Sequence, residues 1–216
     1  MPRPTGFARV GAAAAALTIG TLAVLGGAAS AALAGTTPMA PVGRATANPA
    51  STPIVVVGTT GLRWDDVGAL TTPALWDLSR SGSVGTVSAR SLGTSACPAD
   101  GWLAVSAGER ASDLAGANFG ECRTLREPGS DGLVPGWADY LESATEADYA
   151  ARPGLLGDTL ASAGVTATGI GPGAAIALAD SSGRPVGEHL QRPRGADDLT
   201  ARVGAALKTS RLVVVD

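Results

Sequence analysis

The chain has 216 residues, of which 45% are hydrophobic and 16% are charged, and its formal net charge is -3. This length and composition allow one domain with a hydrophobic core. The basic residues are scattered and form no block of Lys or Arg, so the sequence gives little support to nucleic-acid binding.

Residues 1–34 have the pattern of a secretory signal peptide. Arg3 and Arg9 precede an uncharged run that extends to residue 34, and small residues within it predict signal cleavage after Ala31 or Ala34. The same run is long enough to span a bilayer, so an N-terminal membrane anchor is the alternative. In both cases we expect an exported, extracytoplasmic protein, secreted or membrane-anchored, whose partner is the membrane or the cell envelope.

Residues 35–53 are rich in Pro, Thr and Ala and are interpreted as a linker, so the folded domain is expected over residues 54–216. It opens with Ile54–Val57, a β-branched run typical of a buried strand, which leads into a polar turn containing Thr59 and Thr60. Ligands of α/β proteins bind just past the carboxyl ends of such strands. Thr59 and Thr60 are therefore pocket candidates, although a purely structural turn role for Thr60 is the alternative.

The first half of the domain is predicted to contain a short helix, a strand and two further helices. Thr72 and Pro73 give a helix start and Gly82 a stop. Next we expect a strand over Ser83–Ala89 and a helix over Pro98–Ala107. After them come a loop-rich stretch up to Pro135 and a surface helix over Val134–Ala144 with one buried side.

The second half repeats a helix-then-strand pattern. One helix starts at Pro153 and ends at Gly164 before a strand over Val165–Ile170, and another helix, capped by Asp197 or Asp198, precedes a strand over Leu212–Val215. This alternation predicts an α/β fold with a mostly parallel sheet sandwiched by helices. Between the two units we expect a strand-to-loop junction at Gly169–Gly173 and a small hairpin from Ile176 to Val186.

Four segments together resemble the alkaline-phosphatase superfamily, in its phosphodiesterase-like branch. They are the strand with Gly61-Leu62-Arg63, the Thr72–Leu78 segment, Gly82–Gly85, and Thr94-Ser95-Ala96-Cys97-Pro98. The resemblance implies an alkaline-phosphatase-like fold in an envelope protein of actinobacterial type. The chain stops at Asp216, at the end of a predicted strand, so the fold looks incomplete relative to that family.

The resemblance also implies where chemistry would occur. The family has a metal-binding Asp at the position of Thr60 and a nucleophile at the position of Ala96, so a catalytically degenerate binding or scaffolding module without metal or cofactor is the first hypothesis. The alternative is a divalent-metal-dependent phosphoester or sulfoester hydrolase whose other ligands lie beyond Asp216. Thr94 and Ser95 are then the catalytic candidates, and Asp100 places negative charge where a phosphate would bind.

Cys97 and Cys122 are expected to form a disulfide, because an exported chain with an even number of cysteines favours pairing; two separate buried thiols are the alternative. His189, the single histidine, is interpreted as a surface or packing residue, and Asp65 and Asp66 as capping or surface residues. The four tryptophans fit either core packing or a sugar- or lipid-binding surface. They are Trp64, Trp76, Trp102 and Trp137.

Overall fold

The computed structural model describes residues 52–86, 96–113, 122–147 and 149–216. The predicted signal peptide or anchor with its cleavage sites at Ala31 and Ala34 lies outside the described residues, as do most of the linker and the catalytic candidates Thr94 and Ser95. In the described part, no helix combines the length and the apolar character needed to cross a membrane.

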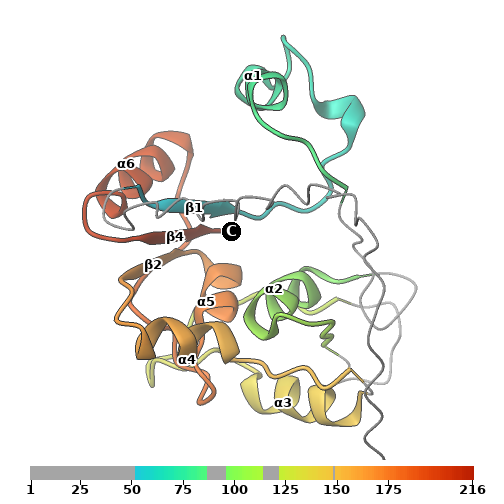
Figure 1. Cartoon of the computed structure of the whole chain (residues 1–216), viewed down its shortest axis with the longest axis vertical. Helices are drawn as coiled ribbons and strands as arrows, with labels where there is room; N and C mark the ends of the chain where they lie inside the picture. Colours follow the sequence, from blue (N-terminus) through green and yellow to red (C-terminus); the bar gives the residue numbers. More distant parts are fainter. Residues whose placement is uncertain (1–51, 87–95, 114–121, 148) are drawn as a thin grey trace, which may run out of the picture. The chain divides into compact units, whose positions relative to one another are not determined.

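The described residues form a four-stranded parallel sheet with the order β1-β4-β2-β3 (Figure 1). The strands are β1 (Ile54–Val57), β2 (Ala167–Ile170), β3 (Glu188–Leu190) and β4 (Leu212–Val215). Helix α5 (Pro172–Leu178) connects β2 to β3, and α6 (Ala196–Ala206) connects β3 to β4. The predicted α/β class with a parallel sheet and flanking helices is therefore confirmed.

The two faces of the sheet bury different side chains of β4. Val214 packs into the larger core, which also contains residues of α2 (Pro98–Ala107), α4 (Leu155–Ser162) and α5. Val213 and Val215 pack on the opposite face with Ala206, Leu199 and Val203 of α6. Because neighbouring residues of a strand point to opposite faces, the run of valines in β4 serves both cores at once.

Two further helices lie at the predicted places, the first with the predicted bounds and the second with shifted bounds. Helix α1 (Pro73–Ser81) begins with Pro73 after Thr72 and follows a short 3-10 helix, η1 (Trp64–Asp66). Helix α3 (Trp137–Glu146) buries one side, where the Trp137 and Tyr140 rings meet edge to face with centroids 6.2 Å apart. The prediction of a helix with one buried side is confirmed.

Five predictions in this domain need correction. The expected burial of β1 is wrong, because this strand lies at the edge of the described sheet and all four of its residues are exposed. The expected cap of α6 is also wrong, because Gly195 is its N-cap residue and Asp197 and Asp198 lie in its first turn.

The proposed loop after Gly169 is wrong beyond Gly171, because α5 begins at Pro172, and Ile176–Leu178 belong to this helix and not to a hairpin strand. An isolated antiparallel bridge between Ala179 and Pro185 is the part of the hairpin that exists. Residues 83–86 form no strand, and the rest of the predicted strand Ser83–Ala89 lies outside the described residues.

Candidate ligand pocket

A pocket of about 860 Å³ lies at the carboxyl ends of β1 and β4, beside the start of α2. Its lining combines backbone of the turn after β1 with residues of α2 and the loop after it, namely Val56–Leu62, Ala96–Pro98, Asp100–Trp102, Ala104, Val105, Arg110, Ala111 and Asp216. The three residues proposed as pocket candidates, Thr59, Thr60 and Asp100, are all among them. Their placement agrees with the sequence argument, and their roles stay predictions.

The turn after β1 forms one wall of the pocket. The Gly58 amide donates to the Val215 carbonyl at 2.9 Å, which extends the β1–β4 pairing by one residue before the chain turns. Gly61 has φ +76°, a left-handed conformation that L side chains rarely adopt. Thr59 and Thr60, between these glycines, are exposed and bring two hydroxyl groups to the pocket.

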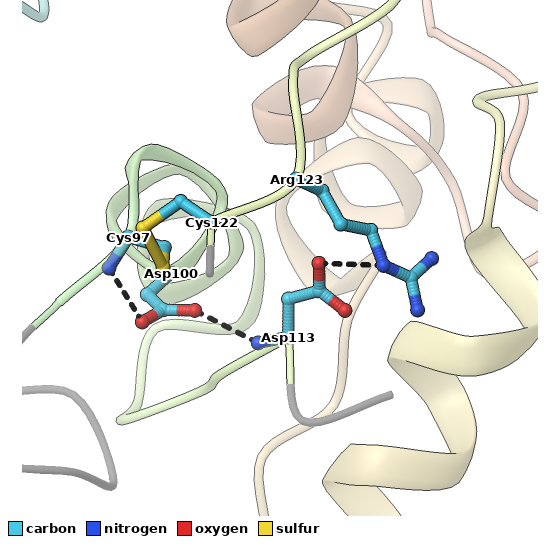
Figure 2. Close-up of a disulfide and its surroundings, with 5 residues drawn as sticks. All are labelled: Cys97, Asp100, Asp113, Cys122 and Arg123. Atoms are coloured by element: carbon cyan, nitrogen blue, oxygen red, sulfur yellow. Dashed lines mark hydrogen bonds and ion pairs between the residues drawn. A yellow bond between two sulfur atoms is a disulfide. The ribbon is translucent and has the colours of Figure 1, made fainter. Parts of the chain in front are cut away.

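The first turn of α2 forms the second wall, and Asp100 organises it (Figure 2). Asp100 is only 4% exposed, and its carboxylate accepts hydrogen bonds from the amides of Cys97 at 2.9 Å and Asp113 at 2.8 Å. The first contact caps the helix start, where a negative charge also meets the positive end of the helix dipole. Each carboxylate oxygen of Asp100 therefore accepts a hydrogen bond from a backbone amide, and these two bonds stabilise this wall.

The predicted disulfide between Cys97 and Cys122 is confirmed, with a Cα–Cα distance of 5.3 Å. Cys97 is the residue before the first turn of α2, so the bond ties the start of this helix to the segment that leads toward α3. The next residue, Arg123, binds Asp113 through Nε at 3.0 Å and Asp139 of α3 through Nη1 at 2.7 Å. Burial tends to lower the pKa of Arg123, but the bond to Asp139 and the charge of Asp113 outweigh it and raise this pKa.

Trp102 belongs to the pocket lining and lies between two glycines. A Cβ atom added to Gly58 would collide with the benzene half of the indole, and one added to Gly173 would collide with its Nε1 side. The ring is 6% exposed and therefore packs as a core residue, as does Trp137. Trp64, by contrast, is 68% exposed. Core packing is therefore confirmed for Trp102 and Trp137, and a ligand-binding role for the exposed Trp64 stays a prediction.

Asp216 brings a second carboxylate to the pocket from the end of β4. Its Oδ2 accepts hydrogen bonds from the amide of Gly173 at 3.0 Å and from the guanidinium of Arg192 at 3.1 Å. Gly171, at φ +90°, leaves room for Asp216 because a Cβ there would crowd it. The carboxylate is thereby fixed between the start of α5 and an arginine that follows β3.

The histidine lies outside this lining, on the edge strand β3. Its Nε2 contacts Glu127 Oε2 at 2.7 Å, and Glu127 Oε1 also accepts the amide of Arg192 at 2.7 Å. His189 is thus a packing residue that fastens the Glu127 segment to β3. Asp66 accepts the Arg63 amide at 2.8 Å, which is a capping contact of the predicted kind.

The lining of the pocket contains few ionisable side chains. Asp100, Arg110 and Asp216 are the ionisable side chains in this lining, and both carboxylates already accept backbone amides. Within the described ranges, no group of three or more His, Cys, Asp or Glu side chains could hold a metal ion. The lining also contains the apolar residues Val56, Val105 and Trp102, and apolar walls with a few polar groups are typical of small-molecule sites.

Comparisons with protein-family models, with curated proteins and with solved structures found no match for this chain.

Two lining residues escaped the sequence analysis. Asp216 follows a valine-rich strand in the same way that Thr59 follows β1, so the rule applied to β1 would also have found it. Trp102 carried no such signal, because its place beside Gly58 and Gly173 depends on how distant segments pack.

Proposed function

We propose that this chain is an exported protein of the cell envelope whose residues 54–216 form an alkaline-phosphatase-like domain that binds a ligand without hydrolysing it. The observation that carries the proposal is the pocket, which lies where α/β proteins bind ligands but whose two carboxylates are occupied by backbone amides. The parallel sheet is compatible with the resembled superfamily.

The residues at the resembled catalytic positions also support binding without catalysis. Thr60 stands where that family has a metal-binding Asp, and one neutral hydroxyl cannot offset the charge of a divalent ion as a carboxylate does. Ala96 stands at the position of the nucleophile and has no reactive group. Both residues line the pocket, and His189 does not.

Export is supported by two independent features of the chain. The N-terminal pattern of Arg3, Arg9 and the uncharged run is that of a secretory signal or an anchor. The Cys97–Cys122 disulfide is of the kind that persists in oxidising compartments. An immunoblot of cell fractions with an antibody against residues 54–216 should find the protein in the envelope or outside the cell, and a purely cytoplasmic signal would contradict export.

The absence of catalysis is tested by turnover measurements. We expect the purified chain not to hydrolyse para-nitrophenyl phosphate, its diester or para-nitrophenyl sulfate in Mg²⁺, Mn²⁺ or Zn²⁺. Metal-dependent turnover that Ser95→Ala abolishes and Ser83→Ala leaves intact would contradict the proposal and support the hydrolase. Ser83 is the matched control because it is exposed and does not line the pocket.

Binding is tested with isolated cell envelopes as the probe. The chain should co-sediment with them, and Thr60→Arg should weaken co-sedimentation because the long side chain fills the pocket beside the turn. Thr124→Arg adds the same charge and size at an exposed residue outside the lining and should have no effect. Equal co-sedimentation of both variants would show that the pocket is not the binding site.

A further inference from the structure

The disulfide and a set of polar contacts join the same two segments beside the pocket. Cys97 lines the pocket, whereas its partner Cys122 is exposed. The loop that the disulfide closes spans a sequence separation of 25 and contains all of α2. The α2 wall of the pocket therefore lies inside a covalently closed loop.

The polar contacts form a second connection in parallel with the disulfide (Figure 2). Asp100 accepts the Asp113 amide at 2.8 Å, and the Asp113 carboxylate binds Arg123 Nε at 3.0 Å. Since Arg123 directly follows Cys122, these contacts lead back to the disulfide. The Asp113 side chain is 3% exposed, so this connection runs through the interior.

We propose that the oxidation state of the Cys97–Cys122 disulfide controls the pocket, because the bond holds the segment whose contacts fix the α2 wall. This redox control would regulate the pocket described above, so the inference rests on the proposed function. In the oxidised chain Arg123 is held next to Asp113, and Asp113 next to Asp100. In the reduced chain the Cys122–Arg123 segment is no longer held covalently to α2, so the Asp113 amide leaves Asp100 more often and the wall opens.

The reductant is a dithiol, and its access is set by the exposure of Cys122. A thiolate of the dithiol attacks the Cys122 sulfur, the protein S–S bond breaks, and Cys97 leaves as a thiolate that takes up a proton. The second thiol of the reductant then attacks the mixed disulfide and releases Cys122. One dithiol is oxidised to a disulfide, and the protein disulfide is reduced to two thiols.

Amide hydrogen exchange on the full chain tests this control without any ligand. The amides of Cys97 and Asp113, which both donate to Asp100, should exchange about tenfold faster after treatment with dithiothreitol, while amides of β2 and β4 keep their rates. The double variant Cys97→Ala/Cys122→Ala should show the faster exchange without reductant and no response to it. Arg202→Met, which breaks an ion pair on α6, should behave as the wild type.

Two results would overturn the inference. One is unchanged exchange at Cys97 and Asp113 in the reduced chain and in the double variant. The other is an equal increase throughout the sheet, because the disulfide would then stabilise the whole domain and not the pocket wall. Neither hydrogen-exchange result depends on the envelope-binding assay. A chain that binds no envelope component can still show redox control, and a chain that binds can lack redox control.

Discussion

Trp102 shows how one side chain determines the sequence at two distant positions. Its indole occupies the space where Gly58 and Gly173 would otherwise carry a Cβ, so both positions require glycine for packing reasons. Gly58 has no positive φ, and a sequence-based argument from backbone conformation would therefore miss its role. The requirement follows only from the position of the ring.

Gly58→Ala should consequently destabilise the domain. The added methyl group would overlap the indole, and overpacking of this kind costs about 1–3 kcal/mol of the free energy of unfolding. Urea denaturation monitored by circular dichroism measures the change. Gly204→Ala is the matched control, since a Cβ there meets open space inside α6 and should stabilise by about 0.4–1 kcal/mol. Equal stability of Gly58→Ala and the wild type would show that Trp102 does not fill this space.

Tyr140 gives the domain a specific response to alkaline pH. Burial, and next the negative charge of Asp113, raise the pKa of Tyr140 from 10.0 to about 12. Between these values the unfolded chain has lost the tyrosine proton while the folded chain still holds it, so the free energy of unfolding should decrease as pH rises. We expect a loss of about 1–2 kcal/mol across this interval. Urea denaturation at a series of pH values measures it, and Tyr140→Phe should remove that part of the loss. A variant that loses as much as the wild type would exclude Tyr140 as its source.

At the scale of elements, α2 depends on a buried cap. Asp100→Asn keeps the size of the side chain but places an amide donor opposite an N–H group, so either the Cys97 or the Asp113 amide loses its acceptor. A buried group left without a partner costs about 1–3 kcal/mol. Denaturant unfolding should show a decrease of this size.

The matched control is Asp66→Asn, which alters the same kind of cap on an exposed residue. Asp66 accepts the Arg63 amide at 2.8 Å, but water can replace this bond, so the change should stay within about 0.5 kcal/mol. If both variants lose the same stability, burial of Asp100 does not matter and its capping role is contradicted.

The elements that the sequence predicted correctly are those with a clear start or a clear period. Pro98 and Pro73 mark the first turns of α2 and α1, and Trp137 and Tyr140 mark the buried side of α3. Helix α5 lacks both signals. Its residues are all buried, so it has no polar face to reveal the helical period, and Pro172 between two glycines resembles a loop although it is compatible with a first helical position.

At the scale of the whole molecule, alternation of helices and strands predicts parallel pairing but not the order of the strands. β1 pairs with β4, the last strand described, and this pairing brings Asp216 to the same pocket as Thr59 and Thr60. Such a neighbour relation depends on which faces pack together and leaves no local signal. The strand-end rule could therefore predict Thr59, Thr60 and Asp216 as separate candidates, whereas their meeting in one pocket and the position of Trp102 depended on the tertiary fold.

The same strand order leaves an apolar surface at one end of the sheet. Among the described strands, β1 has a partner only on its β4 side, and Ile54 and Val57 are 64% and 67% exposed. Helix α1 has an exposed apolar surface of its own, since none of its residues is buried and Leu78 is 64% exposed. Among the described residues, β1 is an uncharged edge strand, and such a strand is a common site of self-association.

We therefore expect the chain to associate with itself through the apolar surfaces of β1 and α1 at high concentration. Ile54→Lys and Leu78→Lys place charges on β1 and α1 and should each raise the dissociation constant about tenfold or more, because a buried lysine opposes association. Sedimentation velocity over a concentration series measures the shift. Leu141→Lys in α3 is the matched control, since Leu141 is also partly exposed but lies on another element. A chain that stays monomeric at every concentration, or whose association responds to Leu141→Lys alone, would show that β1 and α1 do not form the contact.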